Sequence, residues 1–264
     1  MNRVDKRRVR ASFSRAAAAY DGRATVQRAV QERVLALLAE AAPAARRVLD
    51  VGAGTGALLE RLAAARPGLL PAAVDLAPGM ALAARRRLPG ARIAAADAEA
   101  LPFRDGAFEL VVSTSTLQWL PRLEPALAEA RRVLAPGGLL AVALFGAGTL
   151  RELLDAWRGA TGPGRGTHRF FSRDEVAEAL ARAGLEPLAV VEEERVERHA
   201  DARAVLRSLK EIGAKAALPG AGARGLGGRG ATVEALRRYE AGHGGPGGVP
   251  VTWRVVYALA RRPG

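Results

Sequence analysis

The sequence predicts an α/β fold in which a mostly parallel, doubly wound sheet carries helices on both faces. Apolar segments alternate with helical segments through residues 46–145, and such alternation is typical of parallel strands joined by crossover helices. The strand segments are also continuous apolar runs, as expected for strands that are buried on both faces. We therefore expect one domain of this class, closed by an antiparallel C-terminal strand.

The core elements follow one another closely along the chain. An amphipathic helix over residues 24–41, with apolar side chains at helical spacing, precedes the first strand. The expected strands are residues 46–51, 71–75, 91–96, 108–113 and 138–145. The expected helices between them are residues 57–65, 78–88 and 124–134.

Beyond residue 148 the patterns are less regular. Helices are expected over residues 149–159, 173–183, 201–218 and 232–241, and strands over residues 186–193 and 251–261. The stretches 219–230 and 242–248 are rich in glycine, which favours loops, and the first could be a lid hinge. The single domain of residues 1–264 is accordingly divided into a helical N-terminal cover (1–42), a cofactor-binding core (46–145), a helical insertion (149–170), a helical lid insertion (201–248) and a closing strand (251–261).

Composition narrows the class of protein further. Hydrophobic residues make up 49% of the 264 residues. The charged N-terminus lacks the apolar stretch of a signal peptide, and no run approaches the length of a membrane span, so we expect a cytoplasmic protein without membrane contacts. The chain has no cysteine and only three scattered histidines, which excludes a cysteine nucleophile and disfavours a metal site. The net charge of +13 can reflect arginine-rich codon usage, or it can attract a polyanion such as nucleic acid or an acidic carrier protein.

A glycine turn lies between the first strand and the first core helix, at residues 48–56 (VLDVGAGTG). Gly52, Gly54 and Gly56 allow the backbone to pass close beneath a bound nucleoside. Asp50 ends the strand, where a carboxylate suits the cationic amino-acid part of S-adenosylmethionine. Residues 52–57 also fit the dinucleotide pattern, so this motif alone leaves NAD open.

Two later acids bear on the choice between S-adenosylmethionine and NAD, and Asp97 is the one that favours S-adenosylmethionine. Asp75 ends the second strand and could bind the ribose hydroxyls of either cofactor. Asp97 follows the third strand, where it could accept from an adenine amino group while Ala98 packs on the ring. A single aspartate is as readily a helix cap as a ligand. The assignment of S-adenosylmethionine therefore rests on all of these residues together. The candidate cofactor residues are Asp50, Gly52, Gly54, Gly56, Asp75, Leu76, Met80, Asp97, Ala98 and Ser113.

The fourth strand ends in residues 113–119 (STSTLQW), at the carboxyl edge of the sheet where ligands bind in open α/β folds. We therefore expect substrate contacts there, although Trp119 could equally be a core residue. The segment lacks the Asn/Asp-Pro-Pro-aromatic signature of enzymes that methylate adenine in nucleic acids. We expect no nucleic-acid partner, and we weigh a non-catalytic basic binding module only as a remote alternative.

Five segments outside the glycine turn are less widely shared among enzymes. They are residues 13–20 (FSRAAAAY), 117–119 (LQW), 144–153 (LFGAGTLREL), 207–214 (RSLKEIGA) and 249–253 (VPVTW). With these segments the chain resembles the malonyl-acyl-carrier-protein O-methyltransferases of biotin synthesis, which belong to the class I methyltransferases with a Rossmann-like fold. The resemblance implies transfer of a methyl group from S-adenosylmethionine to the free carboxylate of a malonyl thioester, with S-adenosylhomocysteine as product. The methyl ester then primes pimeloyl synthesis.

The resemblance also suggests residues for the acceptor. A malonyl carboxylate is already ionised and needs no general base, but its burial requires positive partners. Arg207 and Lys210, one turn apart on a helix, are candidates for this, unless they belong to a solvated face. Tyr20 could close over the cofactor and bind the carboxylate, and Gln118 could orient either group. Trp119 and Trp253 complete the expected substrate site.

The acceptor and its carrier are less defined than the cofactor. The thioester could be carried by acyl carrier protein or by coenzyme A, and a monomer is the expected state. The main alternative is a methyltransferase acting on another small carboxylic acid or on a quinone precursor, because a shared core does not select a substrate.

Overall fold

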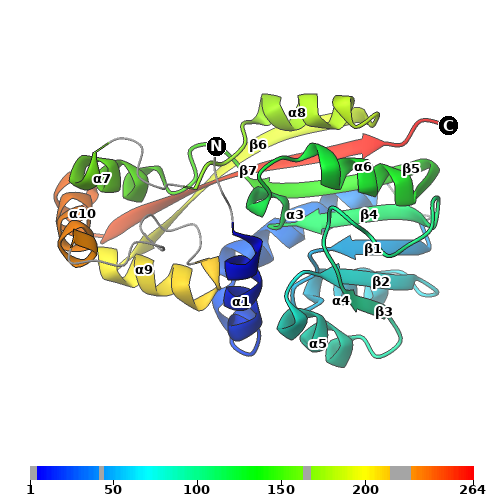
Figure 1. The fold of residues 1–264 in the computed structure, drawn as a ribbon, viewed down its shortest axis with the longest axis horizontal. Coiled ribbons are helices and arrows are strands. Elements are labelled where there is room, and N and C mark those ends of the chain that lie inside the picture. Colours follow the sequence, from blue (N-terminus) through cyan, green and yellow to red (C-terminus); the bar gives the residue numbers. More distant parts are fainter. Residues whose placement is uncertain (1–4, 42–44, 163–167, 215–226) are drawn as a thin grey trace.

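The computed structural model describes residues 5–41, 45–162, 168–214 and 227–264. It contains a seven-stranded sheet with the strand order β3-β2-β1-β4-β5-β7-β6 (Figure 1). The strands are β1 Arg47–Val51, β2 Leu70–Asp75, β3 Arg92–Ala95, β4 Phe108–Thr114, β5 Leu134–Phe145, β6 Glu186–His199 and β7 Val249–Arg261. Only β7 runs antiparallel to its neighbours in this sheet, so the expected fold class is confirmed.

Helices cover both faces of the sheet because alternate strand residues point to opposite sides. Val48 and Leu110 belong to an apolar cluster shared with α3 Thr25–Ala41, α4 Ala57–Ala65 and α5 Pro78–Arg87. Their neighbours Leu49 and Val111 belong to a second cluster. That cluster is shared with α6 Glu124–Val133 and α8 Arg173–Arg182.

Strands β6 and β7 continue beyond the core as a two-stranded arm (Figure 1). Helices α7 Arg151–Thr161, α9 Ala202–Glu211 and α10 Gly227–His243 gather at its far end. Buried Glu152 accepts a hydrogen bond from the Thr252 backbone N at 3.1 Å, and the Tyr239 hydroxyl donates to the Pro250 carbonyl at 2.5 Å. These bonds attach α7 and α10 to β7.

The N-terminal helices lie between the arm and the core (Figure 1). Helix α1 Lys6–Ala16 contacts α5, and the short α2 Tyr20–Arg23 contacts α9. This places them over the carboxyl edge of the parallel strands, where the sequence predicts the ligand.

The regions after residue 148 differ most from their sequence-based boundaries. The strand expected over residues 186–193 extends to His199, because its charged second half pairs with β7 while its other edge is free for solvent. The helix expected over 201–218 ends at Glu211. Helix α10 starts at Gly227, so residues 227–230 are helical although a glycine-rich hinge was expected. The rest of that stretch, 219–226, lies outside the described residues.

The start of α10 is helical although it is rich in glycine. Glycine disfavours helices by about 1 kcal/mol relative to alanine, but α10 packs along α7, and tertiary contacts can outweigh that preference.

In the described part of the chain, no helix is long and apolar enough to span a membrane.

Candidate cofactor and acceptor site

A cavity opens at the carboxyl ends of β1, β2 and β4. The glycine turn, Asp75, Asp97 and Trp119 contribute to its walls, and α1 covers it with Lys6, Val9 and Phe13. Leu76, Met80 and Ala98 line it as well. The structure therefore brings together most of the predicted cofactor residues.

The three glycines of the turn have different roles. All three have positive φ, which favours glycine. A Cβ on Gly52 would lie 2.2 Å from the Thr116 side chain, whereas a Cβ on Gly54 would meet no described atom within 4 Å. A Cβ on Gly56 would lie 3.2 Å from that of Ala84. Gly52 and Gly54 therefore form the cavity wall, while Gly56 allows α4 to approach α5.

Asp75 is held by the backbone around it. Its carboxylate accepts hydrogen bonds from the Gly54 N at 2.8 Å and the Ala77 N at 2.7 Å. Burial raises the pKa of Asp75 to about 6, although these two backbone donors lower it. The carboxylate lines the cavity and so remains available to ribose hydroxyls.

Asp50 lies deeper than Asp75. It is 1% exposed and does not line the cavity. Burial, and then the nearby Asp75, raise the pKa of Asp50 to about 8, and its Oδ1 has no hydrogen-bond partner among the described residues. Contact between Asp50 and the cofactor ammonium therefore remains a prediction.

Asp97 is paired with a residue that the sequence did not single out. Its Oδ2 lies 2.6 Å from the Lys6 Nζ, and its Oδ1 accepts from the Glu99 N at 3.0 Å. Lys6 also pairs with the Glu99 carboxylate. Helix α1 is thus attached to the expected adenine site. In the sequence, Lys6 is marked only by its position in a basic N-terminal run. Its partner Asp97 lies 91 residues away, so no local pattern links the two residues.

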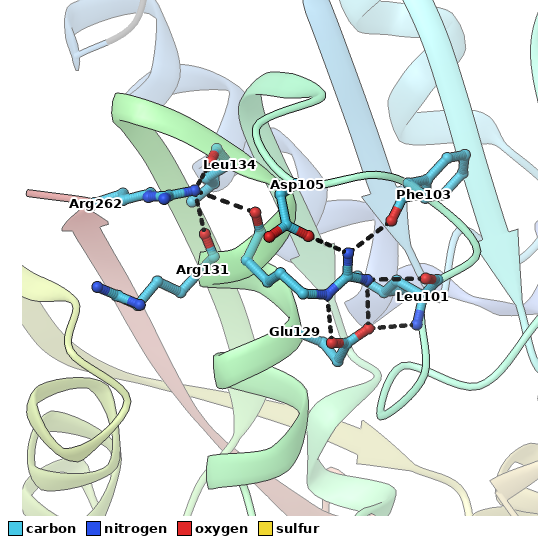
Figure 2. A network of polar contacts seen from close by, with 8 residues as sticks. Leu101, Phe103, Asp105, Glu129, Arg131, Leu134 and Arg262 are labelled. Atoms are coloured by element: carbon cyan, nitrogen blue, oxygen red, sulfur yellow. Dashed lines mark hydrogen bonds and ion pairs between the residues drawn. The ribbon is translucent and has the colours of Figure 1, made fainter. Parts of the chain in front are cut away.

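The loop after Asp97 is fixed from α6 (Figure 2). Arg132 donates to the Leu101 carbonyl at 3.0 Å and to the Phe103 carbonyl at 2.7 Å. Glu129 binds Arg132 and accepts from the Leu101 N at 2.7 Å. These bonds fix the loop that follows Asp97, on the side of the cavity where adenine is expected.

The N-terminal cover is docked at two further points. A Cβ on Gly79 would lie 2.6 Å from the Ser14 carbonyl oxygen, so α1 and α5 approach closely only because this residue is glycine. Near α2, the Thr55 hydroxyl donates to the Asp21 Oδ1 at 2.6 Å. This contact places Tyr20 in the cavity wall. Burial, with Asp75 and Asp21 nearby, raises the pKa of Tyr20 well above its usual value, so its hydroxyl stays protonated.

A second, apolar cavity adjoins the first. Phe13, Tyr20, Ser115 and Trp119 line both. The sequence did not single out Ser115, whose φ of 52° is unusual for a non-glycine residue. Ser115 belongs to the polar run at the end of β4. In the sequence, that run was the signal that could have marked Ser115 as a site residue.

The predicted acceptor residues Gln118 and Trp253 also line the apolar cavity. The Gln118 Nε2 donates to the Ser115 carbonyl at 2.8 Å, while its buried Oε1 has no partner in the described ranges. Trp253 donates through Nε1 to the Glu197 Oε2 at 3.1 Å. Tyr20, Gln118, Trp119 and Trp253 are therefore brought together around one space.

Three other predicted residues lie elsewhere. Arg207 and Lys210 are exposed on α9 and line neither cavity, because Leu209 and Ile212 form the inward face of this helix. Their contact with the acceptor carboxylate therefore stays a prediction that the lining of these two cavities does not support. The Ser113 hydroxyl donates to the Val51 carbonyl at 2.8 Å and joins β4 to β1 instead of lining the cavity.

The fold and the site together define a class I S-adenosylmethionine-dependent methyltransferase. A family model described as a methyltransferase domain matches residues 49–142. The chain belongs to the malonyl-acyl-carrier-protein O-methyltransferase family. It is 52% identical to the enzyme of that name from Geobacter sulfurreducens, over 98% of this chain and 100% of the relative. It is 40% identical to the one from Laribacter hongkongensis, over 98% and 90%.

Solved structures support the fold. The YcgJ protein from Bacillus subtilis superposes with a TM-score of 0.61 at 17% identity, covering 88% of this chain and 99% of that one. A SAM-dependent methyltransferase from Thermotoga maritima gives 0.55 at 19% identity, covering 95% and 98%.

Lys6→Met should make the cofactor dissociate about fivefold faster, since a partly exposed ion pair contributes up to about 1 kcal/mol and 1.4 kcal/mol is tenfold. Stopped-flow measurement at low and high salt would check this, because salt weakens exposed pairs. The dissociation rate of the wild type should rise with salt more than that of the variant. Arg7→Met, an exposed residue on the same helix, is the control. Equal rates for wild type and Lys6→Met would contradict the attachment of α1.

Cofactor affinity should fall below about pH 6, where Asp75 gains a proton. The ribose hydroxyls bind the ionised carboxylate, so binding must release that proton. The dissociation constant should therefore rise by up to about tenfold per pH unit on the acid side, and Asp75 should add no pH dependence well above its pKa. Calorimetric titration of wild type and Asp75→Asn checks this: the variant should bind more weakly and lose this part of the acid dependence. An identical pH profile in both proteins would exclude Asp75 as the group whose protonation weakens cofactor binding.

Proposed function

We propose that this enzyme transfers the methyl group of S-adenosylmethionine to the free carboxylate of a malonyl group carried by acyl carrier protein. The relatives named above act on malonyl-acyl-carrier protein according to their names. The observation that carries the proposal is the apolar cavity joined to the cofactor cavity by Phe13, Tyr20, Ser115 and Trp119.

The walls of the apolar cavity fit an acceptor that needs no base. Among the described residues, no aspartate, glutamate, histidine, lysine or arginine lines it. His168 packs on Trp119 with ring centroids 5.1 Å apart, but burial lowers the pKa of His168 to about 4, which makes it a weak base. A carboxylate is already ionised, whereas the phenol of a quinone precursor needs a base. The geometry therefore favours the carboxylic acid.

Chain residues would position and enclose the acceptor. The Tyr20 hydroxyl, protonated at the junction of the two cavities, can donate to one carboxylate oxygen while the other faces the methyl group. The cofactor supplies the methyl group on a positively charged sulfur. Phe13 and Trp119, with ring centroids 5.6 Å apart, exclude water at the junction. Catalysis then depends on proximity and alignment.

The exposed residues of α9 fit the carrier. Arg207 and Lys210 line a surface hollow together with Arg15 and Arg23, and Glu211 is the one acid among the described residues of its lining. We call these four basic residues the basic patch. An acidic carrier protein would be attracted to it, which speeds encounter more than it raises affinity.

The proposal is tested with labelled S-adenosylmethionine and either malonyl or acetyl carrier protein. Label should enter the malonyl form alone, because only that form offers a free carboxylate. Equal labelling of both forms, or labelling of neither, would contradict the proposal. Malonyl-coenzyme A in place of malonyl carrier protein tests which carrier of the thioester the enzyme prefers. We expect slower transfer from coenzyme A, because it cannot cover the basic patch.

A further inference from the structure

We propose that the carrier's thioester arm enters through a groove between α2, the start of α3, the end of β6 and α9, and not through the hollow of the basic patch. This inference rests on the proposed function, because it assigns the path of that substrate. The arm is a long, flexible chain with a phosphodiester at its outer end.

The groove is a surface feature of about 610 Å³. Gly22 and Thr25 form one side, the Glu197 end of β6 lies at its base, and Ala204 and Ser208 of α9 form the other side. Its width comes from small side chains on both sides, which leaves room for a narrow chain.

The groove continues into the site through shared walls. Gln27, Ile212 and Trp253 line both the groove and the apolar cavity. The apolar cavity in turn shares four residues, including Tyr20, with the cofactor cavity. The three spaces thus lie in series from the surface to the expected methyl group.

The hollow of the basic patch lacks this continuity. Among the residues that the structure describes, it shares Arg23, Arg207 and Glu211 with the groove and none with the apolar cavity. Its other basic residues, Arg15 and Lys210, therefore face the carrier protein and not its arm. Arg23 and Arg207 stand between the two regions, where the arm joins the carrier.

The chemistry of the walls changes along the path in the order that the arm requires. Arg198 and Arg207 line the groove and suit a phosphodiester. Arg23 lines it as well but lies 3.5 Å from Glu211, whose charge it balances. The other acid of the described lining, Glu197, accepts from Thr25 at 3.0 Å and from Trp253. Farther in, Ile212 and Trp253 offer apolar surface to the uncharged part of the arm.

The passage is narrow without its occupant. The apolar cavity has a volume of about 20 Å³, close to the ~10–15 Å³ that a single water needs. Entry of the arm therefore requires Gln27, Ile212 or Trp253 to move aside.

The absence of cysteine from this chain makes a direct test possible. Ser208→Cys puts a single thiol in the groove, Ala19→Cys puts one in the hollow of the basic patch, and Ala64→Cys puts one on the exposed side of α4. Each variant is alkylated with iodoacetamide in the presence of S-adenosylhomocysteine. Malonyl-loaded carrier protein is then compared with carrier protein that lacks the arm.

At a loaded-carrier concentration about ten times its dissociation constant, alkylation of Ser208→Cys should slow about tenfold. Armless carrier, tested at its own saturating concentration, should leave Ser208→Cys nearly unprotected. Both carriers should slow Ala19→Cys, and neither should slow Ala64→Cys. Protection of Ser208→Cys by armless carrier to the same extent, or no protection by the loaded form, would overturn the route.

The outcome is separable from that of the proposed function. If wild-type enzyme methylates malonyl carrier protein but Ser208→Cys is not protected by the arm, the route alone is wrong. If wild-type enzyme does not methylate it, the proposed function fails first. Equal protection by coenzyme A at the same concentration would contradict the carrier protein as the preferred source of the arm.

Discussion

Gly52→Ala should both unfold the protein more easily and abolish cofactor binding. The left-handed backbone, with φ of +75°, costs a residue with a Cβ about 1–2 kcal/mol. The new methyl would also lie 2.2 Å from Thr116, and overpacking of this kind costs about 1–3 kcal/mol. Thermal unfolding and equilibrium binding of the cofactor measure the two effects.

Gly54→Ala is the matched variant. Its φ of +56° imposes a similar backbone penalty, but no described atom lies within 4 Å of the new Cβ. The methyl would instead occupy the space of the cofactor. We expect Gly54→Ala to retain more stability than Gly52→Ala while losing cofactor affinity to a similar degree. Equal losses of stability in the two variants would contradict the assigned contact with Thr116.

Tyr20→Phe should lower kcat by roughly 100-fold, the size expected when a reacting group is misplaced by about 1 Å. Removal of the hydroxyl takes away the donor at the junction of the two cavities, while the ring still packs near Phe13 with centroids 6.4 Å apart. The dissociation constant of the cofactor should therefore change little. Single-turnover methylation and equilibrium binding separate the two quantities.

Tyr239→Phe is the control for loss of a buried hydroxyl. Tyr239 lies in α10 and donates to the Pro250 carbonyl, away from both cavities. We expect this variant to lose about 1 kcal/mol of stability and to keep its kcat. A fall in kcat for Tyr239→Phe as large as for Tyr20→Phe would mean that the hydroxyls act through the fold alone.

The core was predictable because its signals are local. Helix α4 Ala57–Ala65 has the boundaries expected from the sequence, since a glycine turn and an apolar stripe define its start and its buried face. Asp75 is the last residue of β2 and Asp97 lies two residues beyond β3, and the carboxyl ends of parallel strands meet at one edge. Proximity along the chain was enough to place them at the cavity.

The arm was less predictable because its signals are not local. The second half of β6 is rich in charged residues, and its sequence does not have the apolar pattern that predicts a strand. Its pairing with β7 nevertheless keeps it extended to His199. The orientation of α9 also depends on contacts that are not local. The sequence places Arg207 and Lys210 away from the apolar stripe, and only the packing of that stripe shows which face of the helix lines the apolar cavity.

The sequence by itself determined the sheet class, the glycine turn, the acids around the cofactor and the resemblance to a family, because strand periodicity and turn chemistry act over a few residues. Only the tertiary structure decided that Lys6 pairs with Asp97, that the residues of α9 divide between a cavity and a surface, and that groove and cavities lie in series. These contacts join residues far apart in the chain, and their geometry depends on how the helices pack onto the completed sheet.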